Sequence, residues 1–389
     1  MQTITTTEAL AAFCESAARA PYVTIDTEFI RERTYYSRLC LVQMAIPAPD
    51  GSPEGPAVLV DPLADGLTLD PLYALLRDDS TVKVFHAARQ DLEIFFVDAG
   101  VFPRPLFDTQ VAAMVCGFGD QIGYETLVRK IARANMDKTS RFTDWSRRPL
   151  SEAQKKYALA DVTHLRVIYE HLAQELDRSG RTAWVAEELA VLTDPQTYQT
   201  DPETAWQRLK TRSNSARFLG IVRELARFRE EYAQARDIPR NRVIKDDALL
   251  EIASTRPTDL EELGRARLLL REARRGDVAD GLLRAVKAGL ETPAEQLPDP
   301  GNARGAQLQV NPALADLLRV LLKARAEQTG VAAKLLASAS ELDAIAAGER
   351  DLPALRGWRA EVFGNDALRL CRGEIALSAK GSNVTIVEV

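Results

Sequence analysis

The sequence has few of the residues that form zinc sites and disulfide frameworks. Its 389 residues include only four cysteines and three histidines. The cysteines are widely scattered and form no CxxC pair, so reduced thiols in a cytoplasm are expected. With so few histidines, a zinc site built from cysteine and histidine is not expected. A metal site in this chain would instead use carboxylate oxygens, which select hard cations such as magnesium or manganese.

Long hydrophobic runs are also missing. No apolar stretch approaches the roughly 18 residues that a membrane span needs. The N-terminal stretch "MQTITTTEALAAFCESAARAP" has no basic start followed by an apolar core, so a short lead-in and an amphipathic helix are expected rather than a signal peptide. A hydrophobic content of 46% with 27% charged residues is typical of a soluble globular protein. The length allows two or three domains.

Charge is distributed unevenly along the chain. The net charge of −6 argues weakly against nucleic acid as a partner. Residues 205–290, however, contain 19 lysines and arginines and 13 acidic residues, a net of +6 that leaves −12 for the rest. A basic middle beside an acidic N-terminal part fits a module that holds nucleic acid next to one that binds metal. A solvated, arginine-rich helical surface would explain the same charge equally well.

The first part of the chain mixes strand and helix patterns. Strands are predicted at "YVTIDTEF", "LCLVQMAI", "AVLVDP" and "VKVFHA", and a helix at "DPLYALLRDD". Residues 151–178 are predicted to form one long helix. Ser151 and Gln154 form a capping-box pattern at its start, and Gly180 suits its end.

Beyond about residue 201 the patterns are helical until the last few residues. Two helical segments are separated by "TPAEQLPDPGNARGAQLQVNP", a linker by composition. The segments can be aligned so that Leu249 and Ile252 correspond to Leu342 and Ile345. Two diverged copies of a small helical domain are therefore predicted, with chance matching of two amphipathic helices as the alternative.

Four acidic residues are candidates for a shared site. Side chains alternate along a strand, so Asp26 and Glu28 in "VTIDTEFIRE" share one face and would repel each other. Asp91 follows the fourth predicted strand, and Asp161 lies on the long helix one turn after Tyr157. If the four carboxylates converge, each raises the pKa of the others, and divalent cations would relieve the repulsion. A pair of metal ions is the arrangement that fits best.

Several segments together resemble one family. "IDTEFIRERTYYSRLCLVQMA" looks like the first motif of ribonuclease D, and "FHAARQDLEIF" resembles its second. "FDTQVAAMVCGFGDQIGYETLV" and "TDWSRRPLSEAQKKYALADVTHL" resemble its connecting region and third motif. The resemblance spans roughly residues 20–175, and ribonuclease D also carries C-terminal helical domains of the HRDC type (named for helicase and ribonuclease D C-terminal).

The resemblance implies an α/β ribonuclease-H-like exonuclease domain followed by all-α HRDC-type helical domains. The expected boundaries are residues 1–195 for the exonuclease domain, 205–291 for the first HRDC domain and 310–380 for a second, more diverged copy. It further implies a 3′–5′ exoribonuclease of the DEDD superfamily that uses two Mg²⁺ or Mn²⁺ ions. Its products would be nucleoside 5′-monophosphates, and its substrates RNA with a single-stranded 3′ end, transfer-RNA precursors in particular.

Residue roles follow from the same resemblance. The four acids map onto Asp26, Glu28, Asp91 and Asp161, with Asp26 bridging both ions, Glu28 and Asp161 holding the nucleophile-side ion, and Asp91 the leaving-group ion. Tyr157, four residues before the last acid, marks the tyrosine subfamily and would orient the attacking water. Side chains that flank the motifs are candidates for RNA contact: Arg31, Arg33, His86, Gln90, Arg147 and Arg148.

Other functions remain open from the residues alone. Nothing in the residue chemistry separates RNA from DNA, so a DNA 3′–5′ exonuclease of the same superfamily is the first alternative. An RNA-binding scaffold with weak activity is the second, although all four acids are present. The helical half could also dock protein rather than nucleic acid. A monomer in the cytoplasm is expected.

Overall fold

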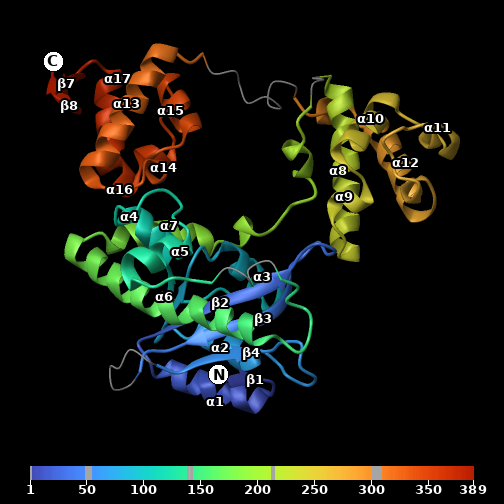
Figure 1. Cartoon of the computed structure of the whole chain (residues 1–389). Helices are drawn as coiled ribbons and strands as arrows, with labels where there is room; N and C mark the ends of the chain where they lie inside the picture. The colour runs from blue at the N-terminus through green and yellow to red at the C-terminus, as the bar shows by residue number, and fades with distance from the viewer. Residues whose placement is uncertain (1, 49–54, 138–139, 141–142, 212–214, 300–308) are drawn as a thin grey trace. The chain divides into compact units, whose positions relative to one another are not determined.

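The computed structural model describes residues 2–48, 55–137, 140, 143–211, 215–299 and 309–389. The contacts divide the chain into two compact units. The first comprises Met1–Phe29, Leu39–Thr197 and Leu308–Val389, and the second comprises Ile30–Arg38 and Tyr198–Gln307. Figure 1 labels the helices and strands.

A six-stranded mixed sheet forms the centre of the first unit. Its order is β1-β4-β3-β2-β5-β6. Strand β2 is parallel to β5, β5 to β6 and β1 to β4, whereas β3 and β4 are antiparallel. The strands are β1 (Gln2–Ile4), β2 (Tyr22–Ile30), β3 (Arg38–Ala45), β4 (Ala57–Val60), β5 (Val82–Phe85) and β6 (Leu106–Asp108).

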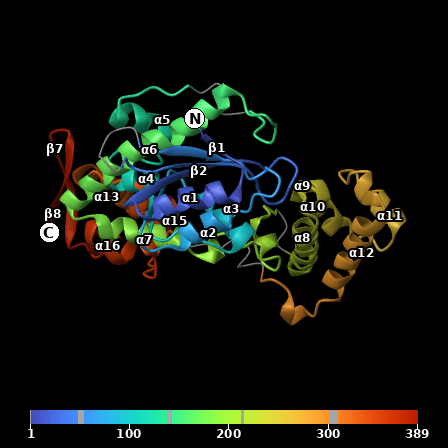
Figure 2. The same ribbon diagram turned by 90° about the horizontal axis from the view of Figure 1, so that it is seen from below.

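Helices cover both faces of this sheet. Figure 2 shows α6 on one side and α1, α2 and α3 on the other. The sheet positions are therefore buried on both faces, which explains the nearly continuous apolar runs of the predicted strands. The helices of this part are α1 (Thr7–Ala18), α2 (Asp70–Arg77), α3 (Arg89–Ala99), α4 (Thr109–Val115), α5 (Tyr124–Leu127), α6 (Glu152–Ser179) and α7 (Thr182–Leu192).

The four predicted strands and both predicted helices are confirmed. Helix α6 begins at the predicted capping box, in which Ser151 and Gln154 bond to each other's backbone, and it ends at Gly180 in the left-handed conformation. Strands β1 and β6, of three residues each, were not predicted, because runs this short carry too little pattern.

One buried charge stabilises the sheet. Lys83 on β5 is fully buried, and its ammonium donates to the carbonyls of Thr81 (2.8 Å), Arg104 (2.5 Å) and Asp78. Burial lowers the pKa of Lys83 to about 8, partly offset by Asp78 and Asp79. The three carbonyls let a lysine occupy an otherwise apolar strand.

The second unit is helical. Its elements are α8 (Ala216–Arg236), α9 (Arg240–Val243), α10 (Asp246–Thr255), α11 (Leu260–Gly264) and α12 (Gly276–Glu291). Its core includes Leu249 and Ile252, and also Tyr35 from residues 30–38. The Tyr35 hydroxyl donates to Glu230, and Arg240 bonds the Tyr35 oxygen at 2.6 Å.

The C-terminal segment belongs to the first unit by its contacts. It contains α13 (Pro312–Thr329), α14 (Ala333–Leu336), α15 (Ala339–Ala346), α16 (Gly357–Arg359), α17 (Asn365–Cys371) and a hairpin of β7 (Ile375–Lys380) and β8 (Asn383–Glu388). Leu342 and Ile345 lie in its core. Among the described residues, no helix is both long enough and apolar enough to cross a bilayer.

Candidate active site

Strand β2 and helix α6 are joined where the acidic residues lie. Thr24 shares a strand face with Asp26 and Glu28, and its hydroxyl donates to the carbonyl of Val162 at 2.9 Å. Val162 follows Asp161 on α6. Because these residues share a face, this hydrogen bond places Asp26 and Glu28 against the turn of α6 that carries Asp161.

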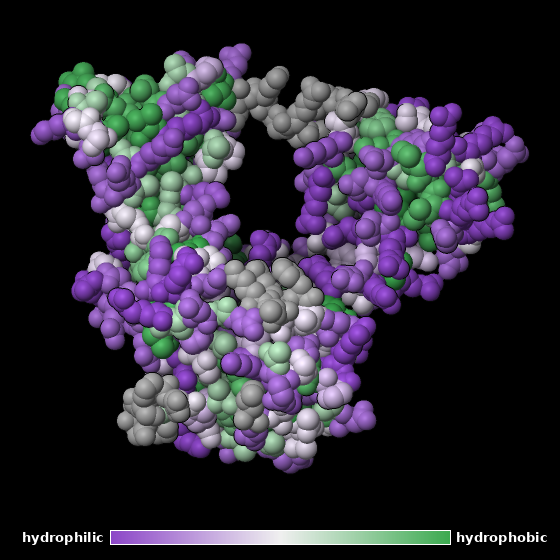
Figure 3. Space-filling view, viewed as in Figure 1, coloured by the Kyte–Doolittle hydropathy of each residue, from purple (hydrophilic) through white to green (hydrophobic). Residues whose placement is uncertain are grey.

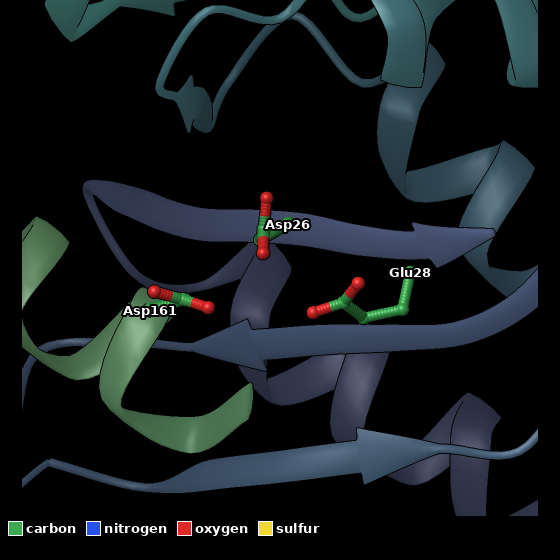
Figure 4. A group of neighbouring side chains, drawn as sticks. All are labelled: Asp26, Glu28 and Asp161. Atoms are coloured by element: carbon green, nitrogen blue, oxygen red, sulfur yellow. The ribbon is translucent and has the colours of Figure 1, made fainter. Parts of the chain in front are cut away.

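Three of the predicted acids form one cluster. Carboxylate oxygens of Asp26, Glu28 and Asp161 all lie within 4.8 Å of one another. Figure 4 shows the three carboxylates facing a common space, two from the strand and one from the helix. Hard oxygen donors at this spacing fit a divalent cation such as Mg²⁺ or Mn²⁺.

Electrostatics favours a cation at this cluster. Burial raises the pKa of Asp26 well above its ordinary value, and the negative charge of Asp161 raises it further. Without a positive charge nearby, ionising these carboxylates together is therefore unfavourable. A divalent cation would restore the charged carboxylates, which is the chemistry that this donor set fits.

Asp91 lies beside the cluster on a different element. It is in the first turn of α3 and is buried, and the hydroxyl of Thr27 donates to its carboxylate. Burial raises the pKa of Asp91, the charge of Asp26 raises it further, and the Thr27 hydrogen bond lowers it. The fourth acid is thus coupled to Asp26 electrostatically and held by the residue between Asp26 and Glu28.

A cavity of about 260 Å³ opens beside these acids. Tyr157 lines it, one turn before Asp161 on α6, and its ring lies 6.2 Å from that of Trp145. The full lining is Asp26, His86, Gly123, Tyr124, Glu125, Thr126, Met136, Tyr157, Asp161 and Leu165. Two acids and the predicted orienting tyrosine therefore face one space.

His86 lies on the wall of the cavity rather than in the acidic cluster. Its Nδ1 is 3.0 Å from the Thr109 hydroxyl, and its ring is 5.3 Å from that of Tyr124. Burial lowers the pKa of His86, partly offset by Asp108 and by a hydrogen bond with the Ile122 backbone. The neutral ring is favoured, as suits a residue that packs and positions.

Tyr124 and Thr27 are site residues that sequence reasoning missed. The Tyr124 hydroxyl donates to the carbonyl of Asp161 at 2.5 Å, so it ties α5 to the turn of α6 that carries this acid. Tyr124 lies in "GDQIGYETLV", within the connecting region. Neither residue had a distinctive spacing, and only the contacts reveal their roles.

The candidate RNA-contact residues differ in their surroundings. Arg148 bonds both carboxylate oxygens of Asp61 at 2.6 and 2.7 Å and the carbonyl of Cys40 at 2.6 Å. Its guanidinium is thereby engaged in joining this loop to β3, so we reassign it to a structural role. Arg147 is exposed and pairs with Asp144 at 3.2 Å.

The remaining candidates are exposed. Gln90 is exposed at the start of α3. Arg31 and Arg33 are exposed on residues 30–38, which belong to the second unit. Their contact with RNA stays a prediction.

Comparison with known proteins identifies the class. Residues 1–177 match the family model described as 3′-5′ exonuclease, and residues 218–286 match that of the HRDC domain. The ribonuclease D of Jannaschia sp. (strain CCS1) is 64% identical over 387 residues, which cover 100% of this chain and 99% of the relative. That of Granulibacter bethesdensis is 51% identical and covers 99% and 96% of the two chains.

A solved structure agrees with this. The crystal structure of Escherichia coli RNase D, described as an exoribonuclease involved in structured RNA processing, has a TM-score of 0.80 at 32% identity and covers 96% of this chain and 98% of its own. The fold and the matched model define a 3′–5′ exonuclease. More closely, the chain belongs to the ribonuclease D family of 3′–5′ exoribonucleases, as the sequence motifs predicted.

Proposed function

We propose that this protein removes nucleotides from RNA 3′ ends with two divalent metal ions, Mg²⁺ or Mn²⁺. The observation that carries the proposal is the cluster of Asp26, Glu28 and Asp161 oxygens within 4.8 Å of one another. Asp26, Glu28 and Asp161 would hold one ion, and Asp26 with Asp91 a second. When bound, such ions activate water and neutralise the charge that develops on the phosphate and the leaving oxygen.

The protein's own residues would divide the remaining work. Tyr157 would orient the attacking water and share its proton, since an ordinary phenol has a pKa near 10 and is a poor base on its own. His86, Tyr124 and Thr126 would shape the cavity around the terminal nucleotide. The products would be nucleoside 5′-monophosphates.

Transfer-RNA precursors with a single-stranded 3′ tail are the proposed substrates. An acidic site attracts a polyanion poorly, whereas the segment from residue 205 to 290 carries a net charge of +6. Polar side chains cover much of the visible face of these helices in Figure 3. We propose that this module holds the body of a folded RNA and so raises the local concentration of its 3′ end.

The domain assignment is proposed as predicted: residues 1–195, 205–291 and 310–380. Leu342 and Ile345 are buried in the third segment as Leu249 and Ile252 are in the second, which supports two related helical domains.

A monomer is proposed. The four cysteines all lie within the described residues and form no disulfide, which fits the proposed cytoplasmic location.

The test compares single-stranded RNA and DNA of one sequence, each labelled at the 5′ end, in Mg²⁺. We expect stepwise shortening of the RNA from its 3′ end, release of nucleoside 5′-monophosphates, and no reaction in excess chelator. Asp26→Asn is the matched inactive control. Equal or faster degradation of the DNA would favour a DNA exonuclease, and binding without cleavage would favour the scaffold.

A further inference from the structure

The wall of the cavity is built on an irregular connection. Residues 116–123 join α4 to α5. The last of them, Gly123, lines the cavity together with Tyr124, Glu125 and Thr126, which follow it. Within this connection Gly117, Gly119 and Gln121 have φ angles of +87°, +100° and +44°. Glycine gives a backbone much freedom, so such a connection needs outside contacts to hold one conformation.

The C-terminal segment supplies contacts at the start of this connection. Its Ala332 backbone donates to the carbonyl of Met114 at 2.9 Å. A Cβ added to Gly117 would meet the Gly330 carbonyl oxygen at 2.9 Å, so the two backbones lie in close contact. Lys334 pairs with Asp120 at 2.5 Å, although exposed ion pairs of this kind add little alone.

Arg181 contacts both α4 and the C-terminal segment, and so bridges the interface between them. One terminal nitrogen donates to the carbonyl of Val115 at 3.0 Å, and the other donates to that of Thr329 at 2.8 Å. Val115 is the last residue of α4 and Thr329 the last of α13. A cation at two helix C-termini is favourable, and both carbonyls would otherwise lack a helical donor.

Further contacts hold the same segment on α7. The rings of Trp184 and Trp358 stack with centroids 4.8 Å apart and an angle of 11°. Arg359 pairs with Glu188 at 2.6 Å, and the Trp358 ring nitrogen donates to the same carboxylate at 3.2 Å. Aromatic stacking and a half-buried ion pair therefore stabilise the packing of the C-terminal segment on α7.

We propose that docking of the C-terminal segment, through Arg181, positions the cavity wall that receives the 3′-terminal nucleotide. Arg181 is a positioning residue in this scheme: it touches neither the acids nor the cavity and acts through α4 and residues 116–123. The inference rests on the proposed function for its substrate. It assigns these helices a role in substrate affinity that is separate from any RNA contact of their own.

The test uses full-length Arg181→Ala, with Arg178→Ala as the matched control. Arg178 is exposed and pairs with Glu175 within α6. The loss of a charge-assisted hydrogen bond typically changes an equilibrium constant by roughly tenfold. We therefore expect KM for a short single-stranded RNA to rise about tenfold, with kcat within about threefold of wild type and an unchanged metal titration midpoint.

A second variant breaks the same interface at another residue. The φ of Ala332 is −59°, which proline adopts, and Ala332→Pro removes the donor to Met114. The proline ring takes the place of the donated hydrogen and so displaces the Met114 carbonyl. The variant should raise KM as Arg181→Ala does. Amide hydrogen exchange of residues 116–126 should be faster in both variants than in wild type and in Arg178→Ala.

Two results would overturn the inference. The first is unchanged KM with unchanged exchange in residues 116–126. The second is a fall in kcat at constant KM, which would place the effect on the acids. The exchange measurement requires no catalysis. If wild type fails to cleave RNA, the proposed function fails, while the exchange result still decides whether the C-terminal segment orders the wall.

Discussion

The hydroxyl of Thr27 donates a hydrogen bond to the carboxylate of Asp91, so the residue between two clustered acids holds the remaining one. Thr27 and Asp91 come from different elements, β2 and α3. This contact joins the strand that carries Asp26 and Glu28 to the helix that carries Asp91. Thr27 is therefore the supporting residue whose removal would be most informative.

Thr27→Val keeps the shape of the side chain and removes the hydroxyl. The pKa of Asp91 should rise further, because the hydrogen bond that lowers it is lost. Supporting residues of metal sites typically contribute about 10–100-fold to metal affinity or activity, and we expect a loss of that size. Thr385→Val, at a strand threonine that bonds the Ser378 carbonyl, is the control. A Mg²⁺ titration of activity measures the effect, and an unchanged midpoint and rate would contradict it.

Asp26→Asn should abolish cleavage and stabilise the metal-free fold. The folded pKa of Asp26 is raised above the unfolded value of about 3.9. Its penalty is thus absent below that value, grows as pH rises from there to the folded pKa, and stays constant above it. Thermal unfolding in chelator should show wild type losing stability over this range relative to the variant, and Mg²⁺ should reverse the difference. Turnover of a short RNA within a few-fold of wild type would refute the assignment.

Tyr157→Phe tests the phenol oxygen while keeping the ring against Trp145. We expect a fall in kcat on the order of 10²–10⁴-fold, as for a positioned proton-transfer group. The metal titration midpoint should stay the same, since the hydroxyl is not a proposed ligand. Tyr169→Phe, three turns further along α6, is the matched control and should retain full activity. An unchanged rate in Tyr157→Phe would leave Tyr157 only a packing role.

The basic module is better tested by substitution than by truncation. Deletion after residue 200 would remove the core around Tyr35 and the segment docked on α7. We therefore choose Arg271, Arg275 and Arg284, which are exposed. Changing all three to glutamine should weaken binding of a folded RNA with a 3′ tail and leave cleavage of a short oligonucleotide unchanged.

The salt dependence of RNA affinity makes the same test quantitative. Each phosphate contact contributes about −0.7 for a single strand and about −0.9 for a duplex to the slope of log affinity against log salt, so three lost contacts should flatten the slope by about 2 to 3. The exposed arginines Arg178, Arg356 and Arg372, changed together to glutamine, are the control. Equal slopes in both triple variants would show that the basic middle is a solvated or protein-docking surface.

Much of the fold was readable from the order of residues. The strand pattern placed Asp26 and Glu28 on one face, and the capping box and Gly180 gave the limits of α6 within one residue. These are local properties: alternation in a strand, the period of a helix and the hydrogen bonding of helix ends need only neighbouring residues. The proposed roles of the acids came from the resemblance to a family, since their convergence is not a local property.

Tertiary structure decided which side chains are engaged in contacts within the protein. Arg148, a predicted RNA contact, is engaged by Asp61 and the Cys40 carbonyl, and Tyr124 reaches the carbonyl of Asp161 across 37 positions. It also assigned Tyr35 to the helical core and the segment after residue 308 to the exonuclease unit. Such pairings depend on burial and hydrogen-bond satisfaction between distant segments, and spacing along the sequence carries no information about them.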